Sequence, residues 1–106
     1  IHKGVSLIIA YCPCINHGID MNKNIDHQIT AVNSGYWPLF RYNPALTTPL
    51  VIDSKKPTAN VIEHLKTQRR FAYFIENNSE QAVLDKLEKN YTDFYNLLET
   101  IANNKK

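Results

Sequence analysis

The sequence has few of the residues that define several large classes of protein. Only two of its 106 residues are cysteines, Cys12 and Cys14, and one proline separates them. Cysteines this close seldom bond to each other, because the ring they would close is small and strained. The disulfide framework of a small secreted protein is therefore excluded. We expect a reducing compartment, either the cytoplasm or the matrix of an organelle.

An excess of charge of one sign and a long hydrophobic run are also missing. The net charge is +2 at neutral pH, and the positive residues are scattered, unlike the basic stripe of a nucleic-acid binder. The longest apolar stretch, Val5–Cys14, contains Ser6 and is too short to span a bilayer. It also matches a signal peptide poorly. We therefore expect neither nucleic acid nor a membrane as a partner.

The apolar stretch near the start indicates a strand. Val5–Tyr11 is rich in β-branched and aliphatic residues and precedes a proline, which is typical of a strand buried in a mostly parallel sheet. Such a strand needs neighbours on both sides, and the rest of the sequence offers at most a short hairpin. We infer that the missing strands lie upstream of Ile1 and that the chain is the carboxy-terminal piece of a longer polypeptide. Proteolytic processing would also leave Ile1 first.

The middle of the sequence predicts a helix and a hairpin. From Met21 to about Ser34, apolar residues recur in steps of three and four, and Gly35 stands where a helix C′ residue belongs. The buried face is predicted to consist of Met21, Ile25, Ile29 and Val32. The aromatic stretch 36–42 and the short run 50–52 then suggest an irregular hairpin, which prolines restrict to a sheet edge or a surface excursion.

The second half is predicted to be helical. A helix from about Ala59 to Phe74 would bury Val61, Ile62, Leu65 and Phe71. Ser79 is the expected cap of the last helix, with Glu80 in its first turn. That helix carries apolar residues at helical spacing: Val83, Leu84, Leu87, Tyr91, Phe94, Leu98 and Ile101. The predicted fold class is α/β, with a strand–loop–helix–hairpin part at 1–58 and a helical tail at 59–106.

Cys14 is the leading candidate for chemistry. A thiolate binds soft metals and iron–sulfur clusters, and active-site groups commonly lie just past the carboxyl end of a buried strand. Composition alone favours the alternative that Cys12 and Cys14 are small buried hydrophobic residues. His17 could act as an acid, a base or a ligand, although a structural hydrogen bond is the commoner role. A zinc site of Cys12, Cys14 and His17 would lack a fourth ligand.

The other polar residues have simpler interpretations. Asp53 and Lys55 are expected to form a weak surface pair, and Arg69 and Arg70 a solvated helix face. His2, His27 and His64 show no helpful spacing to one another or to the cysteines. The aromatic residues flanking Arg41 could stack on a cofactor base, whereas packing of an edge hairpin is the more frequent use of such a stretch.

Three blocks of the sequence together resemble a known family. Ser6–Tyr11 leads into Pro13–Ile19, and Gly35–Pro44 and Asp53–Thr58 follow. In this order and at these intervals they resemble blocks of the pyruvate:ferredoxin (flavodoxin) oxidoreductases. The resemblance covers nearly the whole chain, and the joint pattern is highly specific.

The resemblance implies a fold and a function. The chain would be part of a thiamine-diphosphate-binding domain, incomplete on its own, in an enzyme that converts pyruvate to acetyl-CoA and CO₂. Such enzymes use thiamine diphosphate with Mg²⁺, take coenzyme A as co-substrate, and pass electrons through 4Fe–4S clusters to ferredoxin or flavodoxin, usually as homodimers. The cluster nearest the thiamine is held by four cysteines. The resemblance assigns Cys14 as the last of these and places the others upstream in the parent polypeptide.

Some positions depart from the family pattern. Cys12 stands where these enzymes usually have a small residue, so it is not assigned to the cluster. Lys56 replaces a usual acidic residue, and the loop between Pro44 and Leu50 looks shorter than usual. The segments that bind magnesium, diphosphate, pyruvate and coenzyme A are absent, so the chain is expected to be inactive alone. The alternative is a non-catalytic assembly module whose helices after Pro57 dock on a partner subunit.

Overall fold

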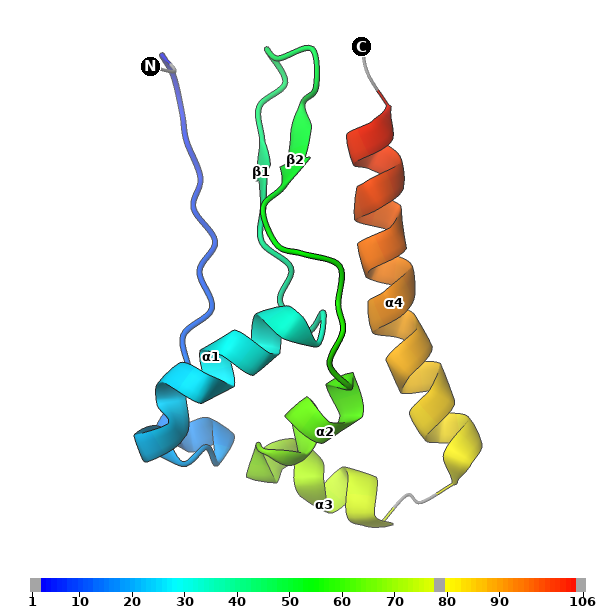
Figure 1. Cartoon of the computed structure of the whole chain (residues 1–106). Coiled ribbons are helices and arrows are strands. Elements are labelled where there is room, and N and C mark those ends of the chain that lie inside the picture. The colour runs from blue at the N-terminus through cyan, green and yellow to red at the C-terminus, as the bar shows by residue number, and fades with distance from the viewer. Residues whose placement is uncertain (1–2, 78–79, 105–106) are drawn as a thin grey trace.

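The computed structural model describes residues 3–77 and 80–104. These residues form a small mixed unit with a two-stranded sheet and four α-helices, about 47 × 31 × 20 Å in extent. In Figure 1 an extended segment, a hairpin and the last helix run alongside one another, and the other three α-helices gather at one end. The elements in order are η1 (Ile15–His17), η2 (Met21–Lys23), α1 (Asn24–Asn33), β1 (Phe40–Tyr42), β2 (Leu50–Ile52), α2 (Val61–Lys66), α3 (Arg69–Asn77) and α4 (Gln81–Asn103).

The prediction of a buried strand at Val5–Tyr11 is not met within this chain. The segment is extended but belongs to no sheet, and Val5, Leu7, Ile8 and Ile9 are between 73% and 95% exposed. A strand is defined by pairing with a neighbour, and the two strands of the described residues pair only with each other. The apolar side chains are therefore present, but none of the described residues covers them.

Helix α1 confirms the prediction of a helix but not of its buried face. It begins after the turn η2, and Gly35 follows it with a φ of +78°, as expected of a C′ glycine. The residues that α1 buries are His27 and Ala31, whereas Ile25 is 70% exposed and Met21 and Ile29 are also exposed. The helix turns its polar side inward because its neighbours in this chain, including α2, lie on that side.

The predicted hairpin is confirmed. Strands β1 and β2 pair antiparallel, with Phe40 opposite Ile52 and Tyr42 opposite Leu50. Leu50 is buried, and β2 packs against α4. The strands are only three residues long, because Pro38 and Pro49 stand just outside them and cannot donate a ladder hydrogen bond.

The helix predicted from Ala59 to Phe74 is divided into α2 and α3. Asn60 caps α2, accepting hydrogen bonds from the amides of Ile62 (2.8 Å) and Glu63 (3.3 Å). The helix is interrupted at Thr67 and Gln68, and the amide of Arg69 donates to the carbonyl of Gly18 (3.2 Å). That amide would otherwise bond within the helix, so a contact with a residue far away in the sequence interrupts it.

The core lies where α2, α3 and α4 meet. It consists of Val61, Ile62, Leu65 and Ile75, with Tyr36, Phe71, Leu84, Leu87 and Tyr91 packed around it. Burial of Val61, Ile62 and Leu65 was predicted and is confirmed. The predicted cap Ser79 lies outside the described residues. On α4, Tyr95 and Leu98 are buried, whereas Phe94 and Ile101 are exposed.

Candidate functional site

Cys14 occupies the first position of a well-defined turn. Its backbone is extended (φ −134°, ψ 144°), and η1 follows directly. The amide of His17 donates to the carbonyl of Cys14 (2.9 Å), and the amide of Gly18 donates to the carbonyl of Ile15 (2.9 Å). Gly18 ends the turn in the left-handed region, with φ +72°. We call residues 14–18 the cysteine turn.

The two cysteines differ in their surroundings. Both are free thiols, but Cys12 is exposed and Cys14 is half-buried. The Sγ of Cys12 donates a weak hydrogen bond to the neighbouring carbonyl of Pro13 (3.5 Å), and the Pro13 side chain is buried. The fixed φ of proline makes the connection between the cysteines stiff. The buried proline therefore separates an exposed thiol from one that is part of the folded turn.

The donor set fits one corner of an iron–sulfur cluster and no complete metal site. Within residues 3–77 and 80–104, no three His, Cys, Asp or Glu side chains are placed to hold a metal ion together. A zinc site of Cys12, Cys14 and His17 is therefore not assembled there. A 4Fe–4S cluster requires four thiolates, of which the free Cys14 can supply one.

Just before the cysteine turn, Tyr11 is bonded to a histidine of α1. The Tyr11 hydroxyl lies 2.8 Å from Nε2 of His27, and Nδ1 of His27 lies 3.3 Å from Oγ1 of Thr67. The Thr67 hydroxyl donates its single proton to the carbonyl of His64 at 2.6 Å. It can then only accept from His27, which places the imidazole proton on Nδ1. Nε2 of His27 is consequently the acceptor of the Tyr11 proton.

Three histidines that are far apart in the sequence meet in this region. The rings of His27 and His64 lie 4.7 Å apart, and Nδ1 of His64 is 2.9 Å from Oγ1 of Thr30. His17 stacks on Tyr11 at 6.3 Å with an interplanar angle of 16°. The sequence spacing of His27 and His64 gave no indication of this contact. No local spacing could have revealed the pair, because two separate helices carry the residues.

Burial keeps the rings of His27 and His64 uncharged near neutral pH. It lowers the pKa of His64 from 6.5 to about 4, with a smaller contribution from His27. It also lowers the pKa of His27, helped by the proximity of His17 and Arg70, and raises the pKa of Tyr11. Buried Nε2 of His64 has no hydrogen-bond partner among the described residues. His27, His64 and Tyr11 therefore interact as neutral donors and acceptors.

On the other side of the cysteine turn, Gly18 touches the start of α3. Its carbonyl accepts from the amide of Arg69, and a Cβ at Gly18 would lie 2.4 Å from the Cβ of Arg69. Only glycine allows this approach, and the positive φ also favours glycine.

Arg70 is not merely a solvated residue, because it donates to Gln68 (2.8 Å) and to the Tyr36 hydroxyl (3.2 Å).

The aromatic stretch 36–42 is divided between two environments. Tyr36 and Trp37 pack on Tyr11, with ring centroids 5.7 and 5.5 Å away. Arg41 pairs with Asp53 across the hairpin, with its Nη2 2.7 Å from Oδ1. The sequence suggested a surface pair between Asp53 and Lys55. That pair is not the one observed, because strand pairing brings Arg41 close to Asp53 instead. The hydrogen bond from Arg41 lowers the pKa of the Asp53 carboxyl.

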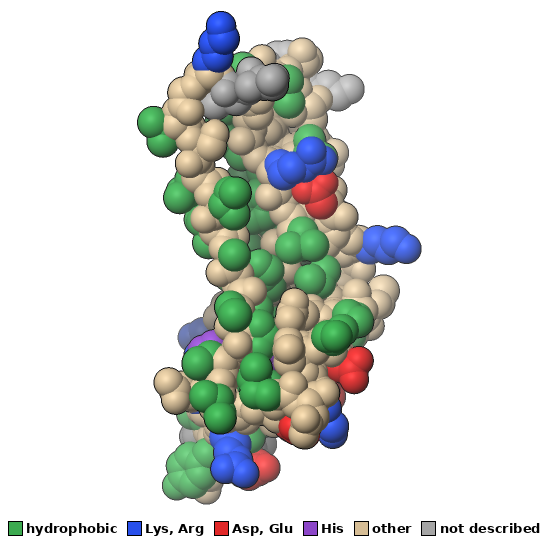
Figure 2. All heavy atoms as spheres, turned by 90° about the vertical axis from the view of Figure 1, so that its left-hand side faces the viewer, with side chains coloured by type: hydrophobic (Ala, Val, Ile, Leu, Met, Phe, Trp, Pro, Cys, Tyr) green, Lys and Arg blue, Asp and Glu red, His purple; other side chains and the backbone are tan. Residues whose placement is uncertain are grey.

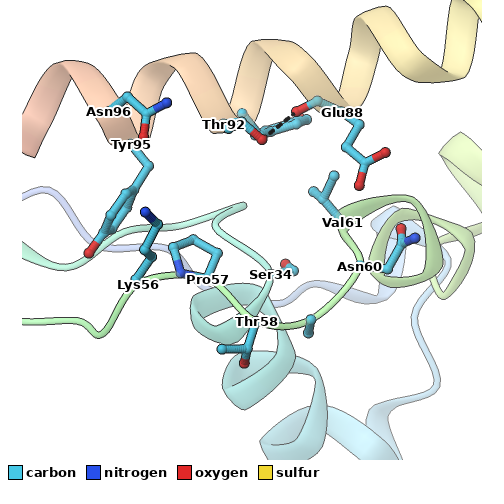
Figure 3. A pocket seen from close by; sticks show the side chains of 12 residues that line it. Ser34, Lys56, Pro57, Thr58, Asn60, Val61, Glu88, Thr92, Tyr95 and Asn96 are labelled. Atoms are coloured by element: carbon cyan, nitrogen blue, oxygen red, sulfur yellow. Dashed lines mark hydrogen bonds between the residues drawn. The ribbon is translucent and has the colours of Figure 1, made fainter.

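A shallow cavity of about 390 Å³ lies between residues 56–61 and α4. Figure 3 shows Tyr95, Lys56 and Pro57 together on one side, with Glu88 and Asn60 on the other. The hydrogen bond drawn there, from Thr92 to the carbonyl of Glu88 (3.2 Å), stays within α4. The lining combines polar groups with no nucleophile and base in contact, so we assign no chemistry to it.

Comparison with known proteins places these features in context. No family model matches the chain. The pyruvate:ferredoxin oxidoreductase of Moorella thermoacetica is 44% identical over 85 residues, which cover 76% of the chain and 7% of that protein. A pyruvate–flavodoxin oxidoreductase of Rhodospirillum rubrum is 31% identical over 106 residues, covering 95% of the chain and 9% of that protein. The mitochondrial pyruvate dehydrogenase [NADP(+)] of Euglena gracilis is 38% identical over 89 residues, covering 78% of the chain and 5% of that protein.

The matches identify the class of protein first. These relatives are all named as oxidoreductases or dehydrogenases of pyruvate, and the chain belongs to their family. More narrowly, it belongs to the pyruvate:ferredoxin (flavodoxin) oxidoreductases, as the resemblance of its three blocks predicted. The chain spans less than a tenth of the length of each of these relatives.

In residues 3–77 and 80–104, no helix is both long and apolar enough to cross a membrane.

Proposed function

We propose that this chain is part of an enzyme that oxidatively decarboxylates pyruvate to acetyl-CoA and CO₂. The reaction releases two electrons per pyruvate, and a 4Fe–4S cluster carries them one at a time to ferredoxin or flavodoxin. The sequence match over 76–95% of the chain supports this proposal. The names of the relatives differ in the electron acceptor, so the acceptor is proposed only as this pair of carriers.

Within that enzyme, Cys14 would hold one corner of a 4Fe–4S cluster. The observation that carries this assignment is the half-buried free thiol at the head of the cysteine turn, inside a block that resembles the family. The other three thiolates, thiamine diphosphate, Mg²⁺ and coenzyme A would be bound by the rest of the parent polypeptide. When bound, thiamine diphosphate supplies the carbanion chemistry at the carbonyl of pyruvate.

The exposed apolar surface supports the view that the rest of a thiamine-diphosphate-binding domain covers this chain. A groove of about 1060 Å³ is lined by Val5–Ile9, Tyr36–Pro44, Asn90, Tyr91 and Phe94. We call it the apolar groove. Figure 2 shows hydrophobic side chains following the face of the molecule along which the N-terminal segment runs. Exposed contiguous apolar surface of this kind marks an interaction site. Val5–Ile9 would then pair as a strand of the larger sheet.

The test replaces Cys14 with serine in the full-length protein that contains this chain. We expect the C14S variant to lose the paramagnetic signal of one cluster and about four iron atoms per protomer. The matched control is Cys12→Ser, which should keep both. Unchanged iron content in C14S, with electron transfer to ferredoxin intact, would exclude Cys14 as a ligand.

The second candidate is a non-catalytic assembly module. It is favoured by the apolar side chains that α4 leaves exposed, namely Phe94, Leu97 and Ile101. A module of this kind would bring α4 to a partner subunit and would bind no iron through Cys14. The iron measurement on C14S therefore also separates the two functions.

A further inference from the structure

We propose that Tyr11 and His27 are positioning residues that fix Cys14 relative to the break between α2 and α3. The proposal rests on the proposed function of Cys14 for its redox consequence. Its geometric part, a turn held from both ends, depends only on the contacts of this chain.

The first tether acts before Cys14. Tyr11 stands three positions earlier in the sequence, and its hydroxyl donates to Nε2 of His27 (2.8 Å). His27 is buried on α1 and continues the chain of hydrogen bonds to Thr67 (3.3 Å). Buried Pro13 stiffens the short link from Tyr11 to Cys14. The position of the Tyr11 ring therefore limits where the backbone of Cys14 can lie.

The second tether acts after Cys14. The cysteine turn closes on itself through the amides of His17 and Gly18. Gly18 then accepts the hydrogen bond from the amide of Arg69 (3.2 Å), at a distance that leaves no room for a side chain. Ile19, the next residue, is buried.

The two tethers end at the same place. The first tether ends at Thr67, which lies in the interruption between α2 and α3, and the second ends at Arg69, directly after it. Because Gly18 takes the amide of Arg69, the helix break and the cysteine turn are parts of one arrangement. Loss of either tether should loosen Cys14 without unfolding the core, which lies at Leu65 and Ile75.

Such tethers matter for a metal ligand. The residues behind a ligand orient it, and they tune the potential of the metal through solvent access and hydrogen bonding. A looser cysteine turn would admit more water to the sulfur of Cys14. We therefore expect Tyr11 and His27 to influence the reduction potential of the cluster without touching it.

The experiment uses the full-length protein with Tyr11→Phe, which keeps the ring and removes the hydroxyl. The matched control is Tyr73→Phe, on an exposed residue of α3 outside the apolar groove. After removal of iron with a chelator, the rate of alkylation of Cys14 by iodoacetamide is measured by mass spectrometry. We expect an increase of about 2- to 10-fold in Y11F, the range that corresponds to one net hydrogen bond, and no change in Y73F. In the iron-loaded protein, the midpoint potential of the cluster should shift in Y11F only.

A second pair of variants tests whether the shared hydrogen bond is responsible. His27→Phe removes the acceptor and should act as Y11F does, and the double variant should be no worse than either single one. His27→Gln offers an amide oxygen and should restore a slow alkylation rate. Additive effects, or an alkylation rate in Y11F equal to the wild-type rate, would overturn the proposal. If C14S keeps its iron while Y11F still speeds alkylation, the proposed ligand role fails and the tether stands.

Discussion

The two ends of the molecule are built on different principles. At one end, the cysteine turn, α1, α2 and α3 satisfy one another through buried side chains and long-range hydrogen bonds. At the other end, the segment Val5–Ile9 and the hairpin leave an apolar groove open. The first, which we call the closed end, is held by contacts among its own residues, whereas the second, the open end, has an apolar surface that the described residues do not cover. The comparison indicates that the contacts around the cysteine turn form within this chain, whereas the described residues leave the apolar groove open.

The two ends also differ in how they use polar groups. The closed end buries His27, His64 and Gln68, and burial lowers the pKa of both histidines. The open end keeps its charged pair, Arg41 and Asp53, at the surface. Buried polar groups are costly unless they are bonded, so they specify one arrangement more strictly than surface pairs do.

The largest expected effect contrasts one leucine from each end. Leu65→Ala should lower the local free energy of unfolding by about 2–5 kcal/mol, because Leu65 is fully buried. Leu7→Ala in the isolated chain should change it by less than about 0.5 kcal/mol, since Leu7 is exposed. Hydrogen exchange of the amides in α2 measures both. In the full-length protein, a cost for L7A as large as that for L65A would show that the open end has become core.

Gly18→Ala should be next in size. The new methyl group would overlap the side chain of Arg69, and alanine disfavours a φ of +72°. Strain and overlap together should cost about 2–4 kcal/mol of local stability. The measurement is hydrogen exchange at Gly18 and Arg69 in the full-length protein. Thr47→Ala, in the exposed loop of the hairpin, is the control, and equal exchange in both variants would contradict the tether.

Acidification should weaken the closed end. The pKa of His64 is about 4 in the fold and about 6.5 when unfolded, so the unfolded chain binds more protons between these values. Stability therefore falls as the pH drops from 6.5 toward 4. At pH 5 the loss should be about 2 kcal/mol, and the lowered pKa of His27 acts in the same direction. Hydrogen exchange of α2 at pH 7.5 and 5 tests this, and His64→Gln should remove most of the difference. A wild-type protein equally stable at both pH values would contradict the burial of neutral His64.

The smallest effect is expected at the open end. Arg41→Gln removes the ion pair with Asp53, but both side chains are solvated and exposed pairs contribute little. Hydrogen exchange of β1 and β2 should be unchanged within error at physiological salt. A clear loss of protection would indicate that the hairpin depends on this pair for its stability.

Local signals in the sequence predicted several elements correctly. The helix ending before Gly35, the hairpin with Leu50–Ile52, and the buried positions Val61, Ile62 and Leu65 are all confirmed. Each depends on residues close in sequence: a C′ glycine, prolines that confine short strands, and apolar residues at helical spacing. The family resemblance of the three blocks was also available from the sequence and is confirmed by the relatives.

Other features follow only from contacts between distant segments. Ile25 is apolar and lies on the predicted buried face, yet it is exposed because the packing partners of α1 lie on its His27 side. The helix breaks before Arg69 because Gly18 takes the amide of that residue. Tyr11 and His27, the residues that hold the cysteine turn, had no signal in their spacing. Local propensity and pattern thus determined which segments are helix, turn and hairpin, and the three blocks together indicated the family. Tertiary structure decided which face is buried and what holds Cys14, because these depend on which distant segments meet.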